Sequence, residues 1–240
     1  GATPVFTRAS GATYRYSDGY LRYAPENLLT YSEQFNNAAW NPTVRISVTP
    51  NDSASPTGSV TADKISETTD LGTHRVTQVV TLNLGVIYSF SAYWKKGTRQ
   101  WVWISINVGS DNSGQFFDLD NVALGSVIQT GTSTTKISAS IVDVGNGWRR
   151  CEFSALINAT NTGGVYSGLA ESNGTFSYTG QTNQYGYIWG AQLERHSSAR
   201  PYISTVASQV FGPRFEYAAD GTPLGLLIEE GSTNLLTYSE

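Results

Sequence analysis

Apolar and polar residues alternate with a period of two along much of this chain, a pattern typical of β-strands with one buried face. The alternation is clear in residues 88–95 and clearest in residues 100–108. In the second stretch one face carries Val102, Ile104, Ile106 and Val108. The opposite face carries Trp101, Trp103, Ser105 and Asn107. Further strands are predicted over residues 43–49, 76–82, 115–119, 136–143, 149–157 and 185–194.

Turn-forming residues separate these stretches, notably in residues 51–58, 145–147 and 161–164. The chain has 24 glycines, and only 14% of its residues are charged. Such a composition is typical of many short strands joined by tight turns, and not of a helical or disordered protein. We therefore predict an all-β fold, an antiparallel β-sandwich of the jelly-roll type, and not a parallel α/β sheet. Residues 32–39 alone favour a helical turn.

A seven-residue segment occurs twice in the sequence. Residues 27–33 and residues 234–240 both read Asn-Leu-Leu-Thr-Tyr-Ser-Glu, and an Asp-Gly pair precedes each copy. The repeat indicates a segment of a modular protein in which a second module begins at the second copy. We expect residues 1–26 to be a connector and residues 27–205 the sandwich. Residues 206–240 are expected to form a second connector and the start of the repeated module.

Charge and hydropathy exclude two classes of partner. The net charge is −4, and no cluster of lysine and arginine is longer than a pair, so we expect no nucleic-acid partner. The longest apolar stretches are only four or five residues, so we expect no membrane insertion. The chain begins with Gly1 and has no methionine, which favours a processed or excised fragment. The single cysteine, Cys151, is expected to be a buried, inert thiol.

Several motifs together resemble phage and prophage structural proteins. They are residues 6–10 (FTRAS), 12–14 (ATY), 144–151 (VGNGWRRC), 187–194 (YIWGAQLE), 201–203 (PYI), 225–230 (GLLIEE) and 233–236 (TNLL). The chain resembles tail-fibre or head-spike proteins that carry jelly-roll modules similar to carbohydrate-binding domains. The resemblance implies a virion or extracellular location, a glycan partner, adjacent modules and a homo-oligomeric fibre. In the carbohydrate-binding family the terminal strands often hold a structural calcium, but here Ile188-Trp189-Gly190-Ala191 replaces the usual acidic run.

The sequence offers little that could support catalysis, and we expect no enzyme activity. His74 and His196 lie in polar stretches without a nucleophile motif nearby, and the sequence has no metalloprotease or phosphate-loop motif. Asp118-Leu119-Asp120 would place two carboxylates on one strand face, a spacing that could suit glycoside hydrolysis. The same pair could equally be a solvated strand end or a weak cation site.

Binding is the stronger case. If the aliphatic face of residues 100–108 is core, Trp101 and Trp103 face outward, where aromatic rings can stack on sugars. If the preceding strand pairs with this one, Tyr93 and Lys95 share that face, and Ser105 and Asn107 supply hydrogen bonds. The alternative is that a connector or a neighbouring subunit covers both indoles. The other tryptophans singled out, Trp40, Trp148 and Trp189, are expected in the core.

A cation site is a further candidate. Glu33 and Glu194 could meet if the first and last strands are neighbours, with Asn27, Asp63 or carbonyl groups completing the ligands. Plain surface carboxylates are the alternative.

Taken together, the favoured interpretation is a non-catalytic carbohydrate-binding-like module of a phage virion or tail fibre that contacts host cell-surface glycans. The rivals are a purely structural spacer of the fibre or spike, and an accessory domain of a polysaccharide-degrading enzyme.

Overall fold

The structure is a computed structural model that describes residues 11–15, 20–40, 44–159, 161–213, 215–218, 220 and 222–226. It contains two compact units, one formed by residues 1–25 and 211–240 and one by residues 26–210. In the smaller unit, β1 (Thr13–Arg15) pairs with β2 (Leu21–Tyr23), and β17 (Phe215–Tyr217) pairs with β18 (Pro223–Leu226), both antiparallel. No helix among the described residues has the length and hydrophobicity that a membrane span requires.

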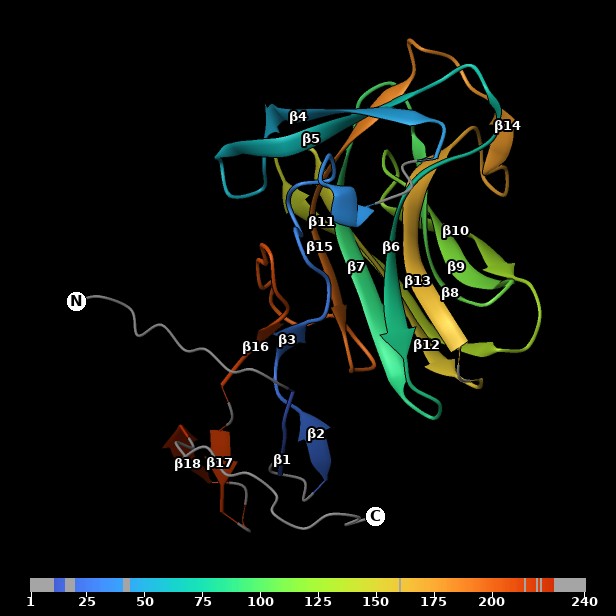
Figure 1. Ribbon diagram of the computed structural model, residues 1–240. Coiled ribbons are helices and arrows are strands. Elements are labelled where there is room, and N and C mark those ends of the chain that lie inside the picture. The colour runs from blue at the N-terminus through green and yellow to red at the C-terminus, as the bar shows by residue number, and fades with distance from the viewer. Residues whose placement is uncertain are drawn as a thin grey trace. The chain divides into compact units, whose positions relative to one another are not determined.

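The larger unit is a β-sandwich (Figure 1). Its described strands form two six-stranded sheets, with the orders β10-β9-β8-β13-β6-β14 (sheet I) and β11-β12-β7-β15-β5-β4 (sheet II). Sheet I consists of β6 (Leu71–Leu82), β8 (Trp101–Val108), β9 (Asp111–Asp118), β10 (Ala123–Gln129), β13 (Asn161–Ala170) and β14 (Ser177–Thr179). Sheet II consists of β4 (Ile46–Ala54), β5 (Val60–Glu67), β7 (Ile87–Lys96), β11 (Thr134–Gly145), β12 (Trp148–Ile157) and β15 (Tyr185–Glu194). Neighbouring strands are antiparallel, so the predicted fold class is confirmed.

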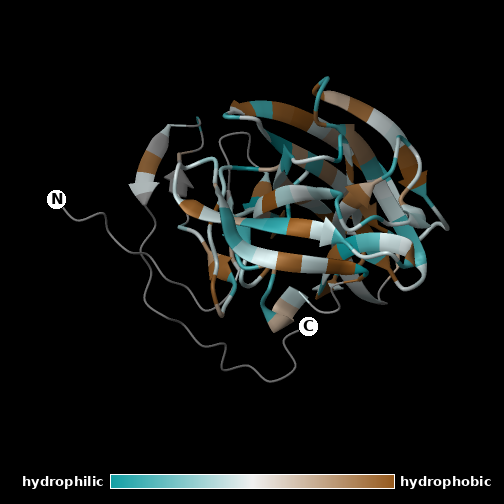
Figure 2. Ribbon diagram, turned by 90° about the horizontal axis from the view of Figure 1, so that it is seen from above, coloured by the Kyte–Doolittle hydropathy of each residue, from teal (hydrophilic) through white to brown (hydrophobic). Residues whose placement is uncertain are grey.

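The main core lies between the two sheets. Val102, Ile104, Ile106 and Val108 of β8 are buried there, as the alternation predicts. Phe90 and Trp94 of β7 and Phe153 of β12 pack against them from sheet II. Figure 2 shows apolar and polar positions following one another along the strands. Cys151 is also fully buried, and burial raises the pKa of its thiol well above the ordinary value. The expected inert thiol is consistent with this position.

The sequence pattern misplaces some elements. Residues 161–164 were expected to form a turn, but they begin β13, which lies between β6 and β8. A Cβ at Gly168 of this strand would lie 2.3 Å from the His74 carbonyl oxygen, so the close approach of the neighbouring backbone requires glycine. Strand β4 continues through residues 51–54 because the left-handed backbone of Asn51 (φ 54°) and a register shift accommodate its bend.

The region expected to form one helical turn has a different shape. Residues 32–36 form turns, and the single 3₁₀ turn η1 (Ala38–Trp40) comes after them. Two short strands, β3 (Glu26–Asn27) and β16 (Val210–Phe211), lie at the ends of the larger unit in sequence. Trp40, Trp148 and Trp189 are all buried, as expected, although only Trp40 belongs to the main core.

A chain shortened to residues 26–210 is expected to unfold in one cooperative transition in urea, followed by near-ultraviolet circular dichroism. This range is slightly longer than the 27–205 module predicted from sequence. A chain that also lacks residues 26–30 is the matched control. It loses the fully buried Leu29 and the Asn27 amide, which donates to the Ala191 and Ile203 carbonyls, so it should lose the transition. A broad transition in the 26–210 chain would contradict the autonomy of the unit.

Candidate functional site

The six residues predicted to share a binding face do not lie together. Strand β8 pairs with β9 and β13 in sheet I, whereas β7 pairs with β12 and β15 in sheet II. Tyr93 and Lys95 are therefore in the opposite sheet from Trp101 and Trp103. The prediction of one shared platform is wrong, because the segment between β7 and β8 crosses from one layer to the other instead of closing a hairpin.

The outer face of β8 is also covered. Trp103 is 0% exposed and packs against Phe176, with ring centroids 5.2 Å apart. Its indole Nε1 donates a hydrogen bond to the Leu169 carbonyl at 3.1 Å. Trp101 is half-buried and packs against the same cluster. Trp103 is therefore covered, as the alternative prediction had it. The covering residue belongs to the segment between β13 and β14 of the same unit, and not to a connector.

The two polar residues of the predicted platform are buried as well. Ser105 is fully buried, and its Oγ donates to the Asn107 Oδ1 at 2.9 Å. Asn107 is also buried. These side chains satisfy each other and are not presented to solvent, so the proposed polar contacts are not available at this face.

An aromatic cluster instead lies on the outer face of sheet II. It consists of Tyr93, Trp189 and Tyr202, with ring centroids 4.7–6.0 Å apart. Tyr93 and Trp189 are direct neighbours in the β7–β15 register, and Tyr202 follows β15 in sequence. Tyr93 and Tyr202 are half-buried, whereas Trp189 is 4% exposed. One residue of the predicted platform, Tyr93, thus belongs to an aromatic surface of a different sheet.

The hairpin formed by β4 and β5 lies across one end of the sandwich (Figure 1). Two indoles hold it there. Trp148 Nε1 donates to the Ala54 carbonyl at 3.0 Å, and Trp189 Nε1 donates to Thr61 Oγ1 at 3.1 Å. These two bonds place the turn of the hairpin, with Thr57 and Ser59, next to the aromatic cluster.

A first pocket opens between the hairpin turn and the aromatic cluster, with a volume of about 290 Å³. Its lining residues are Glu33, Thr57, Ser59, Thr61, Trp189, Tyr202 and Ser204. The Tyr202 hydroxyl lies 2.6 Å from Ser32 Oγ and donates to Glu33 Oε1 at 3.1 Å. Burial raises the pKa of Tyr202, and the nearby Glu33 carboxylate raises it further, so the phenol stays protonated.

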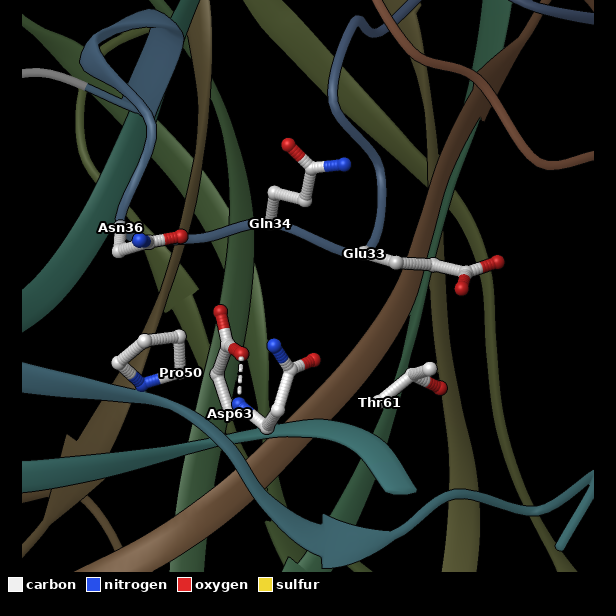
Figure 3. A pocket seen from close by; sticks show the side chains of 7 residues that line it. Glu33, Gln34, Asn36, Pro50, Thr61 and Asp63 are labelled. Carbon is white, nitrogen blue, oxygen red and sulfur yellow. Dashed lines mark hydrogen bonds between the residues drawn. The ribbon is translucent and has the colours of Figure 1, made fainter. Parts of the chain in front are cut away.

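A second pocket of about 280 Å³ shares the lining residues Glu33 and Thr61 with the first (Figure 3). Its lining residues are Glu33, Gln34, Asn36, Pro50, Asn51, Thr61 and Asp63. The segment that carries Glu33, Gln34 and Asn36 is anchored by Phe35. That ring is fully buried against Trp40, and its backbone N–H donates to Asp63 Oδ2 at 2.7 Å. Because the two pockets share Glu33 and Thr61, we treat them as one polar groove.

Asp63 is buried at the floor of this groove. Its Oδ1 accepts the Asn51 backbone N–H at 3.0 Å. Burial raises the pKa of Asp63, and backbone N–H groups of Asn51, Phe35 and Asn36 only partly oppose that rise. In Figure 3 the Asp63 and Glu33 carboxylates lie on different sides of the groove and do not converge.

The predicted cation site at Glu33 and Glu194 does not form. Glu194 is fully buried, and its Oε2 pairs with Arg200 Nε at 2.5 Å, while Oε1 accepts from Gln192 and from the Arg200 backbone. The arginine neutralises this carboxylate and occupies the oxygens that a cation would need. No group of three or more His, Cys, Asp or Glu in the described part of the chain could hold a metal ion.

The Asp118 and Asp120 carboxylates do not form a facing acid–base pair. Strand β9 ends at Asp118, so the two residues do not share a strand face. Burial works to raise the pKa of Asp118, but hydrogen bonds from Asn121 and Gln100 outweigh it, and the pKa is lowered. Asp120 pairs with Lys96 at the surface. His74 is fully buried and stacks on Tyr178, with ring centroids 4.6 Å apart.

No protein-family model matches the chain, and no curated protein sequence matches it. Among solved structures it is similar to the enzymatically active domain of tailspike protein 4 from bacteriophage CBA120, at 15% identity and a TM-score of 0.39. That match covers 70% of this chain and 21% of the tailspike chain, so this chain spans about a fifth of the length of that protein.

Two further matches span the full length of the solved chains. One is the carbohydrate-binding module TmCBM61 in complex with β-1,4-galactotriose, at 14% identity, 72% coverage of this chain and a TM-score of 0.38. The other is a protein from Bacteroides thetaiotaomicron described as sugar binding, at 14% identity, 78% coverage and a TM-score of 0.37. Likeness of this degree does not define a ligand or an activity for this chain.

Proposed function

We propose that this chain is a non-catalytic glycan-binding module and that the glycan lies in the polar groove. The observation that carries the proposal is the first pocket, whose lining combines aromatic side chains with hydroxyl groups. The aromatic residues are half-buried Tyr202 and Trp189, which is 4% exposed, and Thr57, Ser59, Thr61 and Ser204 supply the hydroxyls. A pyranose ring has an apolar C–H face and a rim of hydroxyls, which is the complement of such a lining.

The size of the groove supports an oligosaccharide. Small-molecule pockets usually have volumes of about 300–1,000 Å³. Each of the two pockets is close to the lower limit of that range, and together they fall inside it. The second pocket adds the Gln34, Asn36 and Asn51 amides, which can donate to and accept from sugar hydroxyls. The second pocket therefore extends the set of polar groups that a bound oligosaccharide could contact.

We propose further that the module belongs to a phage virion or tail fibre and contacts host cell-surface glycans. The seven-residue segment at residues 27–33, which recurs at residues 234–240, supports a modular parent protein, because its first copy is part of the sandwich. Asn27 Oδ1 accepts the Leu193 backbone N–H at 3.2 Å, and Glu33 lines the groove. The second copy, residues 234–240, lies outside the described residues. Repeated modules or an oligomer would convert weak single sites into useful avidity.

The rival function is a structural spacer, and one observation favours it. The edge strands β10 and β11 leave large apolar side chains exposed, as neighbouring chains or modules in a fibre would require. These side chains are Leu124, Val127, Ile137, Val142 and Val144, with exposed fractions of 39–52%. A spacer binds no glycan, whereas an accessory domain of a polysaccharide-degrading enzyme would bind the substrate of that enzyme.

A glycan array and a groove-filling variant test the proposal. Ser204 is an exposed residue of the first pocket, so Ser204→Trp should fill the space without removing a buried contact. We expect wild-type protein to bind glycans and Ser204→Trp to bind them at least tenfold more weakly, a change of about 1.4 kcal/mol. Ser110→Trp, at an exposed turn position outside the groove, is the matched control and should bind normally. Wild-type protein that binds no glycan would favour the spacer.

A further inference from the structure

The carboxylates of the groove differ from three buried glutamates of the same unit. Like the buried Asp118, which accepts only from the Gln100 and Asn121 amides and from backbone N–H groups, they have no cationic partner. Glu26, Glu67 and Glu194 are each buried and each pair with an arginine, Arg195, Arg99 and Arg200 respectively, at 2.5–2.6 Å. Asp63 is buried to the same degree but accepts only backbone N–H groups. Glu33 accepts only the Tyr202 hydroxyl. The groove thus holds two carboxylates without a cationic partner.

Positively charged side chains are present on the same sheet, but they contact aromatic rings instead. Lys64 Nζ lies 4.3 Å from the centroid of the Tyr185 ring, and Lys95 Nζ lies 5.9 Å from that of Tyr187. The Arg150 guanidinium lies over Tyr93 and donates to the Arg200 carbonyl at 2.6 Å. These cations do not neutralise Glu33 or Asp63, which leaves the groove with a negative charge.

The missing partner identifies the chemistry of the ligand. An ammonium group interacts more strongly with a carboxylate than a neutral sugar hydroxyl does, because both partners of the hydrogen bond are charged. The neighbouring Tyr202 ring adds attraction for a cation placed over or beside it. An acidic sugar would instead bring a like charge against Glu33 and Asp63 at a desolvated site, which costs free energy.

We propose that the groove selects amino sugars that carry a free, protonated amine, with the ammonium group bound at Glu33 beside the Tyr202 ring. This inference rests on the proposed glycan-binding function and names its substrate class. N-acetylation removes the charge, so the same sugar backbone in its acetylated form lacks the selected group.

Calorimetric titration with three matched oligosaccharides tests the inference: glucosamine oligomers, N-acetylglucosamine oligomers and neutral cello-oligosaccharides, at a pH below the amine pKa. We expect at least tenfold tighter binding of the glucosamine oligomers, and we expect the preference to shrink as salt screens the charges. Glu33→Gln should remove the preference for glucosamine oligomers over N-acetylglucosamine oligomers. Glu171→Gln, an exposed acid outside the groove, is the control and should keep it.

The outcomes separate the inference from the function on which it rests. Equal affinity for the three oligosaccharides, or tighter binding of an acidic glycan, overturns the amine specificity and leaves glycan binding in place. A preference that survives Glu33→Gln overturns the role of Glu33 in the selection. Absence of binding to any glycan overturns both proposals.

Discussion

Trp103→Ala is expected to lower the free energy of unfolding by about 3–5 kcal/mol, as truncation of large buried aromatic side chains usually does. The indole is 0% exposed, contacts Phe176 and Phe116, and donates its N–H to the Leu169 carbonyl. The variant would leave a cavity beneath the covering segment and a carbonyl without its donor. Urea denaturation of wild type and variant measures the difference.

Trp101→Ala is the matched control for this prediction. Trp101 lies on the same face of the same strand and contacts the same cluster, but it is only half-buried. Trp101→Ala should therefore lower the free energy of unfolding by a clearly smaller amount than Trp103→Ala does. If Trp103→Ala changed stability no more than Trp101→Ala and weakened glycan binding instead, the covered position of Trp103 would be refuted, and the outer face of β8 would be the candidate binding surface.

Arg99→Met is expected to lower the free energy of unfolding by about 3–5 kcal/mol, the usual cost of leaving a buried charge without its partner. Glu67 of β5 accepts Arg99 Nε at 2.6 Å and Arg99 NH2 at 3.0 Å, and it also accepts the Tyr178 hydroxyl at 2.6 Å. Because β5 belongs to sheet II and Tyr178 to β14 of sheet I, the Tyr178–Glu67 hydrogen bond joins the two sheets. Arg99, in the segment between β7 and β8, neutralises the shared carboxylate.

The surface pair Lys96–Asp120 provides the control. Both side chains are about 40% exposed, so Lys96→Met should cost less than about 1 kcal/mol. The effect of Arg99→Met should also depend on pH. Burial works to raise the pKa of Glu67, but hydrogen bonds from Arg99 and Tyr178 outweigh it, and the pKa is lowered from 4.5. Ionised Glu67 therefore contributes stability above pH 4.5, and this contribution is lost as the pH falls through the folded-state pKa.

The difference in the free energy of unfolding between wild type and Arg99→Met should accordingly be largest at neutral pH and decrease in acid. Urea denaturation across that range measures it. Equal costs for the buried and the surface pair, or a cost that grows in acid, would contradict the assignment of Glu67 as a charged anchor between the sheets.

The period-two pattern was sufficient for the fold class and for several strands. Residues 185–194 form β15 with the predicted bounds, because both ends of that strand are marked by a change in pattern. Alternation also assigns the faces of β8 correctly. It could not show which sheet receives each strand, since β7 and β8 have similar patterns and the segment between them gives no sign of crossing between layers.

The binding site was harder to predict, because its walls come from distant parts of the chain. The alternation of apolar and polar residues predicts which side chains share a strand face, but it does not predict which segment packs against that face. Trp103 is covered by Phe176, which comes from the segment between β13 and β14. The groove combines the turn after β3, the β4–β5 hairpin and the segment after β15. Serine and threonine at turns carry no binding signal by themselves. Glu33 was singled out for another reason, as a candidate cation ligand together with Glu194.

Cys151 gives this protein a built-in reporter of its own opening. The thiol lies on β12, between β7 and β11, and is fully buried. A thiol reagent can therefore modify it only in molecules whose core has transiently opened, so the labelling rate measures how often the sandwich opens. A ligand that binds the closed state makes opening rarer by the factor 1 + [L]/Kd. Glycan binding at the groove can thus be followed as protection of this buried sulfur atom from the thiol reagent, with no label attached to the glycan.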